Sequence, residues 1–344
     1  MRILIPSIQV PFIKGGATMM TNGLKDALIK NGHDVEVVTI PFKFSPTTYI
    51  ENLIEFWKKQ DFNNFNGYSI DMVIVLQFPA YYVQHKNKVL WIMHQHRAVY
   101  ELYDKENETE ETNKFKKKIH LNDSIELSKI KHKFSMCQNV SNRLKRYNNV
   151  ASIPIYHPPA NEEKFYCNEN YGFIFYPSRI EELKRQYLLI EAMQYTKSKA
   201  VAIIAGDGGQ LENYKLLTQK LNVSEKVSLI GGFSDEEKYT LYARSLAVFF
   251  APYNEDYGYI TLEAMLSSKP VITCKDSGGP LEFVVDKQTG FIVEPDPKEI
   301  AKKIDYLYNN QQKAKSLGEN GLKSYQDKNI SWANVVQGLL GGLK

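Results

Sequence analysis

Short apolar runs alternate with polar, helix-like stretches along most of the chain. In the first half the apolar runs cover residues 2–6, 35–40, 72–76, 89–93, 134–140 and 151–155. In the second half they cover residues 173–176, 201–204, 227–230, 247–250, 271–273 and 291–293. Runs of this length are typical of buried strands, and parallel strands need a crossover, usually a helix, between them. The pattern therefore predicts an α/β protein built from two parallel, doubly wound sheets.

One interruption of this alternation indicates a domain boundary. His157-Pro158-Pro159 and the polar residues 161–170 lack strand or helix periodicity, which is typical of a linker. We therefore expect Rossmann-like domains at residues 1–163 and 164–327, with the strand ends of both facing a common cleft, where ligands bind in such sheets. The stretch 328–344 is rich in apolar residues, and we expect it to form a helix that returns to the first domain.

Composition and charge exclude several classes of protein. The chain has 344 residues, of which 43% are hydrophobic and 24% charged, as expected for a globular protein with two cores. No run approaches the ~20 apolar residues of a membrane span, and residues 1–6 read as a strand without a cleavable signal. The net charge of +4 is too small to indicate nucleic-acid binding. Three widely spaced cysteines show no metal or disulfide pattern, so a reduced, cytoplasmic setting is expected.

The most informative stretch is residues 253–265, which follows a buried strand. Gly258 allows a tight turn into a helix, and the carboxylates Glu255 and Glu263 flank that turn. The amides at the start of this helix suit an anionic ligand such as phosphate; they belong to Tyr259, Ile260 and Thr261. In this arrangement one carboxylate can bind hydroxyls, the amides can bind negative charge, and the second carboxylate can bind other hydroxyls. This combination is typical of a sugar-nucleotide site.

A basic pair follows another strand of the second half. Arg179 and Lys184 are five residues apart, and a planar guanidinium with a compact ammonium makes a workable clamp for a diphosphate leaving group. The alternative is a solvated basic loop. Glycines at 206, 208 and 209 follow the next strand, where a tight turn is the simpler interpretation because the dinucleotide fingerprint is not met.

Strand ends of the first half supply further candidates. Gly15 and Gly16 suit close backbone approach to a phosphate or sugar, or form a flexible turn. His94, His96 and Arg97 end a strand with polar side chains, which favours a functional site over an isolated structural histidine. Neither metal-binding spacing nor a hydrolase motif accompanies them.

The lysine-rich segment Lys114–Lys133 has two interpretations. Such a charge run usually forms the solvated face of a helix. The alternative is attraction to an anionic membrane surface or to a lipid-diphosphate acceptor.

In this order, the pieces of the second half resemble the retaining glycosyltransferases of the GT-B group, family 4, also called glycosyl transferases group 1. Each piece is weak alone, and the resemblance extends over nearly the whole chain. The pieces are Ser178-Arg179, Lys184, residues 189–192 (L-I-E-A), 205–208 (A-G-D-G), 229–231 (L-I-G), Glu255 with Glu263, 278–282 (G-G-P-L-E) and 289–293 (T-G-F-I-V).

The resemblance implies a role for each candidate. Arg179 and Lys184 would bind the donor diphosphate and stabilise charge as the nucleotide departs. Glu255 would contact hydroxyls of the transferred sugar, and His94 would sit near that sugar, next to the acceptor. Other donor contacts would come from Glu263 at the ribose, the backbone of Ile230 at the base, the amides of Gly258, Tyr259, Ile260 and Thr261 beside the sugar, and Gly15 and Gly16 at the diphosphate.

The resemblance also implies a GT-B fold and a reaction. The first domain would face the acceptor, and the second would bind the nucleotide sugar. The enzyme would move a hexose-type sugar from a UDP- or GDP-sugar to a glycan or lipid-linked acceptor of a polysaccharide or the cell envelope. It would retain the anomeric configuration by front-face attack, without a metal or other cofactor. One departure is Arg185, since the family often has glycine there. The alternatives are a sugar-nucleotide epimerase on the same fold and a non-catalytic sugar-nucleotide-binding protein.

Overall fold

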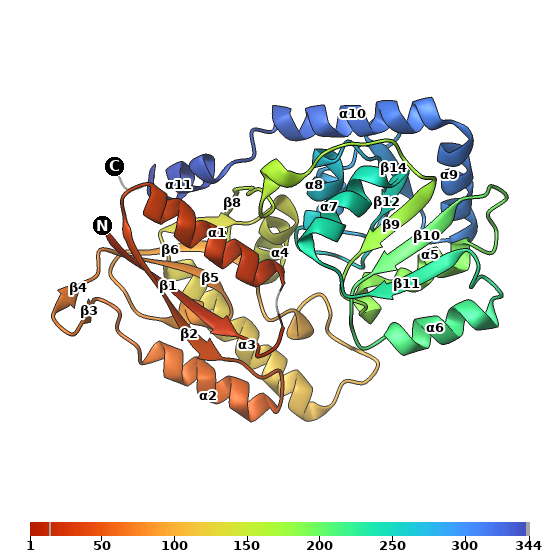
Figure 1. Cartoon of the computed structure of the whole chain (residues 1–344). Helices are drawn as coiled ribbons and strands as arrows, with labels where there is room; N and C mark the ends of the chain where they lie inside the picture. The colour runs from red at the N-terminus through yellow and green to blue at the C-terminus, as the bar shows by residue number, and fades with distance from the viewer. Residues whose placement is uncertain (14, 342–344) are drawn as a thin grey trace. The chain divides into compact units, whose positions relative to one another are not determined.

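The chain folds into two compact α/β units, seen in a computed structural model that describes residues 1–13 and 15–341 (Figure 1). Unit 1 comprises Met1–His157 and the C-terminal segment from Ser331, and unit 2 comprises Pro158–Ile330. Within the described residues, no helix is long and apolar enough to cross a membrane.

Unit 1 contains a parallel sheet of six strands in the order β2-β1-β5-β6-β7-β8, and a small antiparallel pair, β3-β4. Its strands are β1 (Arg2–Gln9), β2 (Asp34–Pro41), β3 (Asn64–Phe65), β4 (Tyr68–Ser69), β5 (Met72–Gln77), β6 (Lys88–His94), β7 (His132–Ser135) and β8 (Ile153–Pro154). Its helices are α1 (Gly16–Lys30), α2 (Thr47–Lys58), η1 (Ala80–Tyr82), η2 (Arg97–Val99), α3 (Glu110–Lys129), α4 (Gln138–Asn148) and α11 (Trp332–Gly341).

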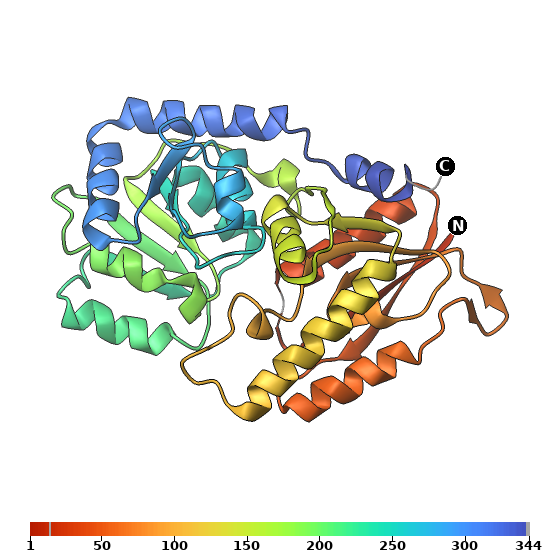
Figure 2. The same cartoon turned by 180° about the vertical axis from the view of Figure 1, so that it is seen from behind.

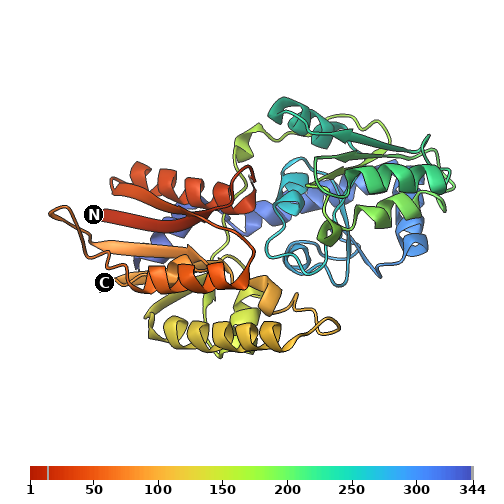
Figure 3. The ribbon, with the colours of Figure 1, turned by 90° about the horizontal axis from the view of Figure 1, so that it is seen from below.

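Helices cover both faces of the unit 1 sheet. Figure 3 shows α1 on one side of the strands and α2 and α3 on the other. Helix α11 packs beside α1, and its Trp332 meets the rings of Trp91 and His157 at centroid distances of 6.2 and 5.5 Å. A Cβ at Gly23 of α1 would lie 2.1 Å from the Trp332 ring, so the closeness of the two helices depends on this glycine.

Unit 2 repeats the layout with a six-stranded parallel sheet in the order β11-β10-β9-β12-β13-β14 (Figure 1), and Figure 2 shows it from behind. Its strands are β9 (Phe173–Pro177), β10 (Val201–Ala205), β11 (Val227–Gly231), β12 (Ala247–Phe249), β13 (Val271–Cys274) and β14 (Gly290–Val293). Its helices are η3 (Glu162–Lys164), η4 (Glu182–Lys184), α5 (Gln186–Ala192), α6 (Leu211–Lys220), α7 (Asp235–Arg244), α8 (Tyr259–Leu266), η5 (Gly279–Glu282), α9 (Pro297–Asn309) and α10 (Gln311–Asp327).

The two predicted doubly wound sheets are confirmed, and all six strands expected in the second half are present. One apolar run was interpreted wrongly. The strand predicted from residues 134–140 ends at Ser135, because Cys137 caps a helix there: its Sγ accepts a hydrogen bond from the Val140 amide.

Candidate functional site

Lys184 and Glu255 meet at one edge of the unit 2 sheet. Strands β9 and β12 are neighbours in this sheet, so the loops that leave their carboxyl ends lie side by side. Lys184 Nζ donates a 2.6 Å hydrogen bond to Glu255 Oε2, and the two side chains are only 18% and 21% exposed. The lysine predicted to bind the diphosphate and the glutamate predicted to bind the sugar therefore neutralise each other's charge.

Main-chain hydrogen bonds hold the Glu255 loop onto the loop that follows β13. The amides of Asn254 and Glu255 donate to the carbonyls of Asp276 and Ser277, both at 2.9 Å. The Gly279 amide donates to the Glu255 carbonyl at 2.8 Å. A Cβ at Gly279 would lie 2.6 Å from two carbonyl oxygens of the Glu255 loop, so this close approach requires glycine. The loop therefore gives the Glu255 carboxylate a defined position.

Gly258 starts α8 in the left-handed region, with φ +86°. A Cβ there would also lie 2.9 Å from Pro280 Cγ, so both the conformation and the space require glycine. The predicted anion-binding amides follow directly, although that of Thr261 already donates to the Gly258 carbonyl at 2.9 Å. The Thr261 hydroxyl is buried and has no hydrogen-bond partner in the part of the chain that the structure describes.

Glu263 lies in a different environment from Glu255. Its side chain is 8% exposed, and Tyr242 of α7 donates a 2.6 Å hydrogen bond to its Oε2. Lys238 Nζ lies 4.0 Å from the other oxygen. Burial raises the pKa of the Glu263 carboxyl above its usual range, although the nearby lysine and the tyrosine hydroxyl oppose that effect.

Three loops meet at the ends of β9, β10 and β11. The Gly206 amide donates to the Gly231 carbonyl at 2.7 Å, and a Cβ at Gly206 would lie 2.0 Å from the Ser178 carbonyl oxygen. The glycines of this turn thus allow close loop packing, as the simpler interpretation of the sequence held. Arg179 is exposed. The side chain of Ile230 is 46% exposed at the end of β11.

The candidates of unit 1 are spread over two strand ends. Gly15 is the N-cap of α1 and Gly16 its first residue. His94 ends β6, and its Nδ1 lies 2.7 Å from the Gln95 carbonyl oxygen.

Two residues that shared the His94 prediction have structural roles. His96 is stacked on Phe78 at 5.0 Å, and burial lowers its pKa to about 4, so it is neutral at physiological pH. Arg97 pairs with Glu101 at 2.5 Å. Aromatic packing and an ion pair thus hold two of the three polar side chains at this strand end, and the role of His94 stays a prediction.

Arg185 is a residue whose importance the sequence indicated only by its departure from glycine. Its guanidinium is buried and binds the Asp276 carboxylate through two hydrogen bonds of 2.8 and 2.7 Å. It also donates to the carbonyls of Ala251 and Pro252 at 2.8 and 3.1 Å.

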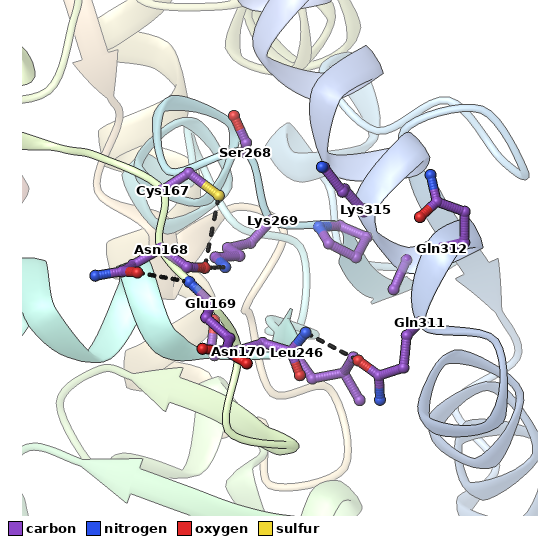
Figure 4. A pocket seen from close by; sticks show the side chains of 13 residues that line it. Cys167, Asn168, Glu169, Asn170, Leu246, Ser268, Lys269, Gln311, Gln312 and Lys315 are labelled. Atoms are coloured by element: carbon purple, nitrogen blue, oxygen red, sulfur yellow. Dashed lines mark hydrogen bonds between the residues drawn. The ribbon is translucent and has the colours of Figure 1, made fainter.

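The opposite edge of the same sheet carries a separate cavity of about 360 Å³ (Figure 4). It lies at the amino ends of β12 and β13 and contains none of the predicted site residues. The thiol of Cys167 and the buried amine of Lys269 both point to the carbonyl of Asn168, at 3.8 and 3.0 Å. Among residues 1–13 and 15–341, no three His, Cys, Asp or Glu side chains converge to hold a metal ion.

Two parallel sheets, with the paired Lys184 and Glu255 at a strand-end edge, define the GT-B class of fold. Sucrose-phosphate synthase from Thermosynechococcus elongatus superposes with a TM-score of 0.78 at 19% identity, over 99% of this chain and 98% of that one. HepE from Anabaena, in a complex with UDP-glucose, gives a TM-score of 0.70 at 16% identity, over 99% of each chain.

The family model of glycosyl transferases group 1 matches residues 159–324. Unit 2 is therefore a glycosyl transferases group 1 domain, and the resemblance predicted from its motifs is confirmed. Human alpha-1,3/1,6-mannosyltransferase ALG2 is 30% identical over 167 residues, which cover 44% of this chain and 40% of that protein. Matches to three curated relatives span between 29% and 55% of their lengths.

Proposed function

We propose that the protein is a glycosyltransferase that moves a hexose from a nucleoside-diphosphate sugar to a glycan or lipid-linked acceptor. The observation that carries this proposal is the 2.6 Å pair of Lys184 and Glu255 beside the glycine-initiated helix α8. A cation for phosphate and a carboxylate for hydroxyls at one strand-end edge suit a sugar nucleotide. The UDP-glucose bound by HepE and the mannosyl transfer in the name of ALG2 support a hexose donor.

Donor binding would exchange the partner of Lys184. The ammonium would leave Glu255 for a diphosphate oxygen, and the freed carboxylate would accept hydrogen bonds from hydroxyls of the sugar. The exposed Arg179 lies on the same loop and would add a second cation to the diphosphate. Because the basic pair neutralises the leaving group, the proposed reaction uses no metal.

The chemical step would retain the anomeric configuration. The bond from the sugar C1 to the phosphate oxygen breaks, and the acceptor oxygen bonds to C1 from the same face. The acceptor proton passes to the departing phosphate oxygen, so the products are the glycoside and the protonated nucleoside diphosphate. His94, near the acceptor in this scheme, would orient the transferred sugar, and Glu263 would bind the ribose.

A donor panel tests the proposal. The full-length protein is incubated with UDP-, GDP- and ADP-sugars, and nucleotide release and protection against thermal unfolding are measured. We expect one donor class to respond and Lys184→Ala to lower its turnover by about 100-fold or more. Lys215→Ala is the matched control, because Lys215 forms a 2.7 Å pair with Glu212 on a surface helix.

The outcomes separate the alternatives. A changed sugar nucleotide without acceptor would indicate an epimerase, and protection without turnover would indicate a binding protein. No response to any sugar nucleotide would refute all three.

We further infer that α3 attaches the protein peripherally to the inner face of a membrane. The exposed Lys114 and Lys117 lie on one face of this helix together with Leu121 and Ile125, which are 63% and 48% exposed. Leu121 and Ile125 follow Lys114 by two and three helical turns. Exposed apolar side chains flanked by lysines favour an anionic bilayer surface.

Vesicle sedimentation tests this contact. We expect binding to phosphatidylglycerol-containing vesicles and none to purely zwitterionic ones. Leu121→Glu should weaken binding about tenfold or more. Leu216→Glu, on α6, is the matched control because Leu216 is also 63% exposed. Equal binding of both variants would contradict the assignment of this face.

A further inference from the structure

Arg185 occupies a backbone conformation that rarely suits a residue with a side chain. Its φ is +54°, in the left-handed region, where a glycine fits without strain. The side chain is nevertheless only 9% exposed and uses four donor contacts from three nitrogens, as given above. A strained residue persists when its surroundings over-determine its position, and these four hydrogen bonds do so.

The acceptors of Arg185 belong to the segments that carry the proposed ligands. Ala251 and Pro252 lead from β12 into the Glu255 loop. Asp276 lies in the loop whose backbone pairs with Asn254, and Arg185 itself directly follows Lys184. The guanidinium thus connects the loop of the cation with both loops that hold the carboxylate.

A main-chain hydrogen bond links the same two loops a second time. The Tyr253 amide donates to the Leu183 carbonyl at 2.8 Å. The Arg185 guanidinium lies 5.8 Å from the centre of the Tyr253 ring. The segments that precede Lys184 and Glu255 are therefore held together both by this hydrogen bond and by the side chain of Arg185.

We propose that Arg185 is a positioning residue that holds Lys184 and Glu255 in register for the transition state. The proposal rests on the proposed transferase function of that site and deepens it. A glycine at this position would adopt the backbone without strain but would supply none of the four hydrogen bonds. In this chain the arginine side chain therefore supplies order that a glycine there cannot.

The central test compares Arg185→Gly with Asn222→Gly in the full-length protein. Asn222 is exposed and has the same φ of +54°, so its variant reports the backbone relief alone. With the responding donor of the panel, Arg185→Gly should lower kcat about 100-fold, because a displacement near 1 Å costs that much. KM should rise by a smaller factor than kcat falls, because interactions that are strongest in the transition state lose most when the two side chains are displaced. The control should keep both constants.

Hydrogen exchange supplies a readout that does not require turnover. In Arg185→Gly, the amides of Asn254, Glu255 and Gly279 should exchange on the order of tenfold faster, while those of the β9–β10 ladder stay protected. Wild-type exchange at these three amides, or a wild-type kcat, would overturn the proposal. An inactive wild-type protein would instead refute the transferase function, and the exchange measurement would still decide the role of Arg185.

Asp276→Asn provides the second variant should Arg185→Gly not fold. It keeps an acceptor oxygen for Arg185 but removes the charged, two-oxygen contact. We expect the same direction of change in kcat and exchange, with a smaller magnitude. Unchanged values in a folded Asp276→Asn protein would overturn the proposal.

Discussion

Replacement of Glu255 by glutamine should strengthen the binding of a free nucleoside diphosphate while it weakens sugar transfer. UDP and GDP carry no sugar, so the proposed hydroxyl contacts of Glu255 do not contribute to their affinity. The carboxylate affects them only through Lys184, which it holds at 2.6 Å. The ammonium must break this hydrogen bond before it can donate to a diphosphate oxygen.

The structure gives the size of the effect. Both side chains are about four-fifths buried, so the pair is neither fully solvated nor fully removed from water. An ion pair in such a position contributes about 1 kcal/mol, which corresponds to an affinity gain of about fivefold. Glutamine keeps the shape and an acceptor oxygen, so the gain reports the lost charge. Salt should reduce the gain, because screening weakens the competing pair.

Isothermal titration calorimetry with UDP and with GDP measures this gain, and the donor panel measures transfer. Glu212→Gln is the control, since its pair with Lys215 lies on the surface of α6. Unchanged nucleotide affinity in Glu255→Gln would refute the reasoning, because it would mean that Lys184 does not bind the diphosphate. A fall in affinity would refute it as well, because it would mean that Glu255 itself assists the diphosphate.

Three further predictions concern stability. Tyr242→Phe removes the 2.6 Å hydrogen bond to Glu263 and should lower the free energy of unfolding by about 1.5–3 kcal/mol. Because burial raises the pKa of Glu263, this loss should be larger at pH 8 than at pH 4.5, as measured by urea unfolding with circular dichroism. Gly258→Ala forces an alanine to φ +86° and against Pro280, which should cost at least about 1–2 kcal/mol and lower the melting temperature. Burial raises the pKa of Asp123 to about 6, so its contribution to the stability of unit 1 is present at low pH and is lost as the pH rises through 6. Asp123→Asn should therefore remove about 1 kcal/mol of the change in unfolding free energy between pH 5 and 7, as measured by tryptophan fluorescence.

The sequence predicted the sheets well because buried parallel strands are short apolar runs. The six strands of unit 2 have almost no polar residues, so pattern alone identified them. The run at 134–140 failed because Cys137 acts as a helix cap, a role that its apolar character conceals. Periodicity reports which side chains are apolar, and capping depends on a single atom that periodicity does not detect.

The sequence named candidate residues for the site but could not predict the contacts between them. Lys184 and Glu255 are 71 residues apart, and only the adjacency of β9 and β12 brings them together. Strand order is a property of the whole sheet, so no local pattern contains it. The sequence singled out Arg185 only because the family often has glycine there. Its hydrogen bonds could not be predicted, since their three acceptor residues lie more than 60 positions away.

The two carboxylates of one motif also show why spacing does not assign chemistry. The turn at Gly258 separates them: Glu255 lies in the loop before it and pairs with Lys184, whereas Glu263 lies in α8 and faces Tyr242 of α7. Glu255 pairs with Lys184, which a diphosphate could bind instead, so Glu255 can give up its partner when the donor binds. The second is buried under a tyrosine hydroxyl, so a ribose diol would have to share or replace that hydrogen bond to reach it. Any difference in ligand between Glu255 and Glu263 thus follows from what each side chain must release, and the two should respond to substitution in opposite ways: Glu255→Gln gains nucleotide affinity, whereas Glu263→Gln should lose it.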